Sequence, residues 1–107
     1  MLKLQIYSFS LVTKYMARWY KVEGYKAHQG AGSYTSVTVY IFAEDATQVL
    51  QRYQIVRGVK RDFRHRHFPN VFPLSPEASE ELEKRINSEG KIPLDEAKRK
   101  WYSLDLI

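Results

Sequence analysis

The chain has 107 residues, of which 44% are hydrophobic, and its formal net charge is +5. This length suits one domain, and the apolar fraction suffices for a buried core. The sequence has no cysteine, which excludes disulfides, iron–sulfur clusters and cysteine-ligated zinc. No apolar run approaches the roughly 20 residues of a membrane span. We therefore expect a cytoplasmic protein with no membrane partner.

The first residues are weakly patterned, and Met16 opens a second plausible start, "MARWYKVEGY". We expect residues 1–15 to be an N-terminal extension or an extra strand that the core does not need. Residues 16–107 are expected to form a single domain.

Two strands are predicted next. Residues 18–27 are rich in aromatic and β-branched side chains, and residues 34–43 alternate between the two faces of a strand. The intervening "HQGAGS" carries two glycines typical of a turn. The pattern predicts an antiparallel hairpin.

The hydrophobic period then changes to that of a helix, over residues 44–57. Glu44 and Asp45 would lie in its first turn, and Gly58 would stop it. The positions expected on its apolar face are Ala46, Val49, Leu50, Tyr53 and Val56. We expect Val49, Leu50 and Tyr53 to pack against Val37, Val39 and Ile41 of the preceding strand.

Residues 59–68 alternate again and are predicted to form a third strand, at a sheet edge or as an exposed arm because of their charges. A connector with several prolines follows. Ser75 and Pro76 are typical of a helix start, and Gly90 of its end. The apolar stripe of that helix comprises Ala78, Leu82 and Ile86.

A short last helix is expected within residues 92–107, with Asp95 as its cap and with Ala97, Trp101 and Leu104 facing inward. The order β-β-α-β-α, with this final helix, predicts an α+β fold. We expect a small single domain with a mainly antiparallel sheet of three or four strands and helices packed on one face.

The whole net charge of the chain lies in residues 52–67, the basic stretch, which hold six lysines and arginines and one aspartate. Such a cluster attracts anionic partners. We interpret it as a surface that binds RNA or single-stranded DNA, RNA being preferred because aromatic side chains could stack on unpaired bases. The residues predicted to bind are Arg52, Arg57, Lys60, Arg61, Phe63, Arg64, His65, Arg66 and His67.

Other interpretations of the basic stretch stay open. It could be a solvated edge strand, it could pair with the glutamates of residues 76–90, or it could bind an acidic protein partner as a regulatory module. Tyr20, Tyr34 and Tyr40 could also form an aromatic platform on an exposed sheet face.

The two histidines of the basic stretch, His65 and His67, would share one strand face. They could bind a metal or act as acid and base in a small nuclease. A metal site needs a third and usually a fourth ligand, and His28 and Asp62 are the only further candidates in the sequence. We therefore expect a non-enzymatic protein without metal, cofactor or catalytic residues, with the nuclease kept as an alternative.

The motifs "YKVEGY", "FAEDA" and "VKR" at residues 59–61 together resemble the archaeal LX ribosomal protein family. The resemblance covers roughly residues 20–63. It implies a strand–strand–helix–strand unit that binds ribosomal RNA. The proline-rich connector and the acidic helix after it depart from that family's pattern.

Overall fold

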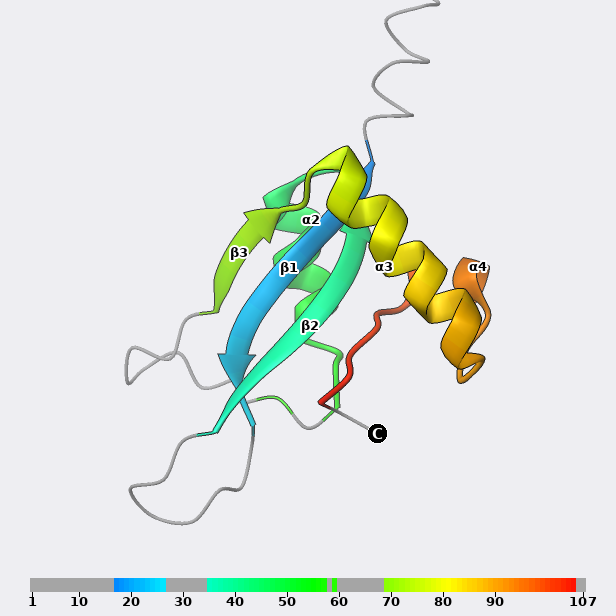
Figure 1. Ribbon diagram of the computed structural model, residues 1–107. Helices are drawn as coiled ribbons and strands as arrows, with labels where there is room; N and C mark the ends of the chain where they lie inside the picture. The colour runs from blue at the N-terminus through cyan, green and yellow to red at the C-terminus, as the bar shows by residue number, and fades with distance from the viewer. Residues whose placement is uncertain (1–16, 27–34, 58, 60–68, 106–107) are drawn as a thin grey trace, which may run out of the picture.

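A computed structural model describes residues 17–26, 35–57, 59 and 69–105. Its elements are β1 (Arg18–Tyr25), β2 (Ser36–Ala43), α2 (Ala46–Tyr53), β3 (Asn70–Pro73), α3 (Pro76–Glu89) and α4 (Leu94–Arg99). The strands form an antiparallel sheet in the order β2-β1-β3 (Figure 1). The predicted α+β class is confirmed.

The first two strands form the predicted hairpin, paired from Arg18↔Ala43 to Tyr25↔Ser36. Their facing residues alternate between the two sides of the sheet. Val22 and its partner Val39 are fully buried on one side, whereas Trp19 and its partner Phe42 lie on the other. The expected turn between the strands lies outside the described residues.

The helix α2 covers the first of these sides. Val49 and Tyr53 of α2 pack into a core with Val22, Val39 and Ile41 of the sheet, and all five are at most 1% exposed. The hydroxyl of Tyr53 lies where a Cβ at position 24 would be, which explains why β1 carries a glycine there.

The extent and phase of α2 differ from the prediction. The helix begins after Asp45, whose carboxylate accepts a hydrogen bond from the Gln48 amide at 2.8 Å, and it ends at Tyr53. Leu50 is 39% exposed, so its assignment to the core is wrong. The helix has only two turns, with Val49 and Tyr53 one turn apart on the buried face, and Leu50 points about 100° away from Val49.

The opposite side of the sheet carries a second core. Trp19 and Phe42 contact each other edge to face at 5.4 Å between ring centroids, and Leu82 and Ile86 of α3 belong to the same cluster. Helices therefore lie on both sides of the sheet, with α2 behind it and α3 in front of its upper end (Figure 1). The expectation that the helices pack on one face only is therefore wrong, because β1 and β2 carry large apolar side chains on both faces.

The helix α3 agrees with its predicted signals. The Ser75 hydroxyl accepts a hydrogen bond from the Ala78 amide at 3.2 Å, and Pro76 occupies the first turn. Gly90 ends the helix in the left-handed conformation, with φ 67°. Leu82 and Ile86 are its buried residues.

The helix α4 differs in its details from the prediction. Pro93 is its N-cap, so Asp95 lies inside the first turn rather than at the cap. Ala97 is buried as expected. Trp101 is only half-buried, and Leu104 is 45% exposed and does not face inward.

The strand β3 lies in the segment that was expected to be a connector. It pairs with β1 from Tyr20↔Pro73 to Glu23↔Asn70. Val59, the first residue of the predicted third strand, makes an isolated bridge with Lys26. Residues 60–68 lie outside the described residues.

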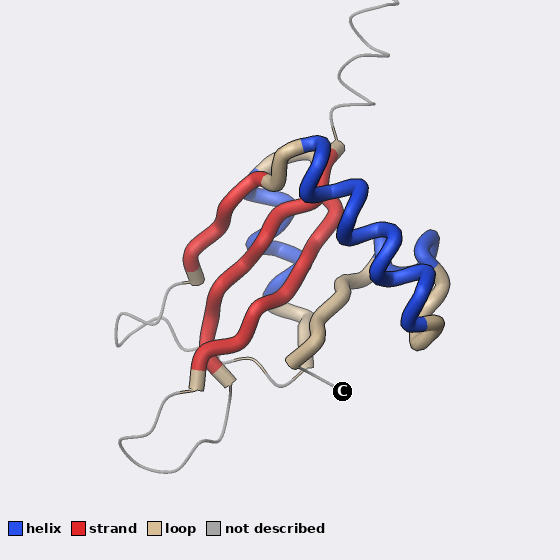
Figure 2. Tube along the Cα trace, viewed as in Figure 1, coloured by secondary structure: helices blue, strands red, loops and turns tan. Residues whose placement is uncertain are grey.

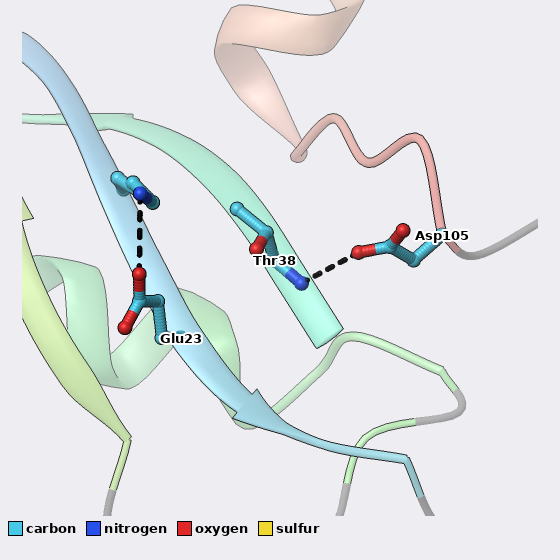
Figure 3. A network of polar contacts seen from close by, with 4 residues as sticks. Glu23, Thr38 and Asp105 are labelled. Atoms are coloured by element: carbon cyan, nitrogen blue, oxygen red, sulfur yellow. Dashed lines mark hydrogen bonds and ion pairs between the residues drawn. The ribbon is translucent and has the colours of Figure 1, made fainter. Parts of the chain in front are cut away.

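The outer edge of β2 is covered by the irregular segment that follows α4, which runs beside the strand in Figure 2. The backbones of Tyr40 and Tyr102 exchange two hydrogen bonds, of 2.7 and 2.9 Å. The Ser103 hydroxyl donates to the Thr38 carbonyl at 2.6 Å, and the Thr38 amide donates to the Asp105 carboxylate at 2.8 Å (Figure 3). We call residues 102–105 the edge segment.

Candidate functional site

The structure describes two residues of the predicted nucleic-acid surface, Arg52 and Arg57, and it separates them. Arg52 is half-buried at the end of α2, whereas Arg57 is exposed in the turn that follows. The other predicted residues lie outside the described part of the chain: Lys60, Arg61, Phe63, Arg64, His65, Arg66 and His67.

Arg52 holds three elements together. Its Nη1 donates to the carbonyl of Phe42 at the end of β2, at 2.5 Å, and to the carbonyl of Lys98 in α4, at 2.9 Å. A charged donor that satisfies two main-chain acceptors in a part-buried position stabilises the packing of α2 against α4. Charge patterning in the sequence does not reveal this role, because the acceptors are main-chain carbonyls and not acidic side chains.

Val59 and Asn70, which flank residues 60–69 in the chain, are both paired with residues at one end of the sheet. Val59 pairs with Lys26, and Asn70 pairs with Glu23. Glu23 and Lys26 are three residues apart in the chain. The Lys26 amide also donates to the Thr35 carbonyl at 2.9 Å, which closes the base of the β1–β2 connection at that end. The described residues Val59 and Asn70 therefore lie near the same end of β1.

A pocket of about 830 Å³ lies beside this region, and we call it the Trp101 pocket. Three segments that are distant in sequence form its walls: the turn after α2, the loop between α3 and α4, and the segment after α4. Its principal lining residues are Ile55, Arg57, Lys91, Ile92, Lys100 and Trp101. The volume lies in the range of roughly 300–1,000 Å³ that is typical of ligand pockets.

The charges at this pocket are unbalanced. Arg57 and Lys91 are exposed and form no ion pair with another described residue. Lys100 is paired with Glu96 at 2.8 Å. The described lining contains no acidic side chain, so two uncompensated cations flank the cavity. An anionic ligand would meet a favourable potential there.

The apolar wall of the pocket combines Ile55, which is 69% exposed, with the half-buried indole of Trp101. Tyr102 also contributes, and its hydroxyl donates a hydrogen bond to the Glu89 carboxylate. Burial, together with that hydrogen bond, raises the pKa of Tyr102 to about 12, so the ring stays neutral beside the cations. The pocket thus offers an aromatic and apolar surface with positive charge at its rim.

A second hollow, of about 530 Å³, lies beside Trp19 and Phe42 at the other end of the sheet. One of its two cations is already engaged, because Lys98 pairs with Glu83 at 3.1 Å and lies 4.9 Å from the centre of the Phe42 ring. The buried indole N–H of Trp19 has no hydrogen-bond partner in the described part of the chain. Arg18 also lines the hollow, is exposed and forms no ion pair with another described residue, so the hollow offers one free cation to a ligand, against two at the Trp101 pocket.

The proposed aromatic platform is not formed. Tyr20 pairs with Ile41 and lies in the core under α2, whereas Tyr40 pairs with Lys21 and belongs to the opposite side of the sheet. Tyr34 lies outside the described residues. The register of the hairpin separates Tyr20 and Tyr40, which sequence spacing alone does not reveal.

Within the described ranges, no three histidine, aspartate or glutamate side chains gather as metal ligands. Both histidines of the hypothetical metal or nuclease site fall outside those ranges. In the same described part of the chain, every helix is too short or too polar to cross a bilayer. The chain matches no protein-family model, no curated protein and no solved structure, so the resemblance to the LX family rests on the quoted motifs alone.

Proposed function

We propose that this protein is a non-enzymatic nucleic-acid-binding domain that contacts single-stranded RNA through the basic stretch. The observation that carries the proposal is the concentration of the whole net charge of +5 in residues 52–67. Lysine and arginine side chains bind phosphates by releasing condensed counterions, so a linear run of cations favours a polyanion. Of the two unpaired cations of the Trp101 pocket, Arg57 belongs to this stretch, and Lys91 adds a positive charge from outside it.

Four of the seven acidic side chains of α3 and α4 have other partners, which argues against neutralisation of the basic stretch by this surface. Glu83 pairs with Lys98, and Glu96 pairs with Lys100. Glu80 lies 3.9 Å from Lys84, and Glu89 accepts the hydrogen bond of Tyr102. Exposed pairs of this kind give only about 0–1 kcal/mol each, so little is gained by exchanging them for arginines of the basic stretch.

The proposal is tested by titrating a labelled single-stranded RNA with the protein at several salt concentrations. Affinity should fall with a log–log slope of about −0.7 per phosphate neutralised. Replacing Arg61, Arg64 and Arg66 with alanine should flatten that slope by roughly 2 and leave the melting temperature nearly unchanged.

The matched control removes the same charge elsewhere, by replacing Lys84, Arg85 and Arg99 of α3 and α4 with alanine. The slope should then change much less. Absence of RNA and DNA binding at low salt contradicts the proposal. A large fall in the melting temperature of the first variant would instead assign the arginines to internal pairing, and binding to an acidic protein alone would favour the regulatory module.

A further inference from the structure

We infer that the Trp101 pocket holds one unstacked base of a bound single strand, with the base on the indole of Trp101 and adjoining phosphates on Arg57 and Lys91. This inference rests on the proposed function and assigns a second contact to the same partner. It uses only side chains that the structure describes.

The apolar surface of the pocket fits a flat ring. Trp101 and Tyr102 come from consecutive positions after α4, and Ile55 and Ile92 add aliphatic surface from two other segments. Bases of single-stranded RNA are recognised largely by stacking on aromatic side chains, because they are not held in a duplex. Ile55 is 69% exposed in the free protein, so a ligand that covers it removes apolar surface from water.

The charges fit the groups that flank a base. A purely apolar ligand would leave Arg57 and Lys91 without a counterion, and a small inorganic anion would leave Ile55 and Trp101 exposed. A nucleotide within a strand carries a ring between two phosphates and uses both surfaces. Lys100 contributes less, because Glu96 already lies 2.8 Å from its ammonium group.

Arg57 belongs both to the Trp101 pocket and to the basic stretch, so one strand could contact both. Arg57 precedes Val59 by two residues, and Val59 is fixed by its bridge to Lys26 at the end of the sheet. The pocket therefore lies close in the chain to Val59, the last described residue of the basic stretch. A polymer that binds the basic stretch can place one nucleotide in the pocket without a separate binding event.

The test compares a 12-nucleotide RNA with a strand of equal length in which abasic residues replace all bases. The chain has two tryptophans, and Trp19 is 1% exposed, so collisional quenching by acrylamide reports mainly on Trp101. The RNA should bind about 10-fold more tightly than the abasic strand, as expected for one stacking contact. It should also protect Trp101 from acrylamide, which the abasic strand should not do.

Two variants locate the contact. Trp101→Leu should remove most of the difference in affinity between the two strands. Ile55→Ser, at an exposed position that tolerates substitution, should reduce the difference even if Trp101→Leu fails to fold. Leu50→Ser is the matched control, because Leu50 is also an exposed apolar residue, in α2, but does not line the pocket.

The two proposals fail differently. Equal, salt-dependent affinities for the RNA and the abasic strand, with no protection of Trp101, overturn the pocket assignment and leave the proposed function standing. Absence of binding to either strand at low salt overturns both. A wild-type protein whose Trp101 is already shielded from acrylamide without RNA would also overturn the assignment, because the pocket would then be closed.

Discussion

Val49 and Leu50 are neighbours on α2 with similar side chains and opposite environments. Val49 is fully buried against the sheet, whereas Leu50 is 39% exposed. Both fit the helical period in the sequence, so the period predicted the helix but not its rotation about its own axis. In a helix of eight residues, few positions constrain that rotation, and the contacts with Val39 and Ile41 determine it.

This difference predicts unequal effects of two adjacent truncations. Val49→Ala should lower the free energy of unfolding by about 2–3 kcal/mol, because it removes buried methyl groups and leaves a cavity. Leu50→Ala should lower it by less than about 1 kcal/mol, as is usual at exposed positions. Urea denaturation of both variants measures the two values. Equal losses would contradict the helix rotation described above.

Arg52 has a structural role that the charge pattern of the sequence did not predict. Its charge placed it within the basic stretch, but its guanidinium is hydrogen-bonded to the carbonyls of Phe42 and Lys98. Charge counting detects acidic partners and not main-chain acceptors. The role of Arg52 in packing therefore became visible only when the fold brought the ends of β2 and α4 together.

Among the secondary-structure elements, α3 was predicted fully and β3 was not. The signals of α3 are local: Ser75, Pro76 and Gly90 each act within one turn of the helix. The strand β3 has four residues, includes Pro73 and follows Pro69, so its sequence resembles a connector. Its pairing with β1 is a long-range property that no local pattern encodes.

The hydrogen bond between the edge segment and β2 should stabilise the protein. Asp105→Ala removes the acceptor of the Thr38 amide and should lower the free energy of unfolding by about 1 kcal/mol. Asp105→Asn keeps an acceptor oxygen and should lower it less. Thermal unfolding measures both effects, and sedimentation measures association through the exposed strand edge. If both variants equal the wild type, the Asp105 carboxylate does not stabilise β2.

For the whole molecule, the class and order of the elements followed from the sequence, but the Trp101 pocket did not. Its walls come from residues 55–57, 91–92 and 100–103, and only the packing of α4 beside β2 brings these segments together. Lys91 and Lys100 were not among the predicted binding residues, because neither belongs to the basic stretch. Trp101 was expected in the core, where it would have been hidden.

The sheet is shared by two cores, which predicts a single cooperative transition. Trp19 belongs to the core beside α3, and Trp101 packs against the core beside α2. Fluorescence of Trp101→Phe reports Trp19 alone, and that of Trp19→Phe reports Trp101 alone. In each variant, the unfolding midpoint by fluorescence should coincide with the midpoint by circular dichroism. Separate midpoints would show that one core melts independently of the other.

The edge segment also affects how the protein emerges from a ribosome. Thr38 and Asp105 are 67 residues apart in the chain. At about 5–20 residues per second, synthesis of the intervening residues takes roughly 3–13 s. During this interval the nascent β2 presents hydrogen-bonding groups that no later residue can yet satisfy. Slow codons between the two positions would lengthen the interval, and the yield of folded protein in cells should therefore depend on translation speed there.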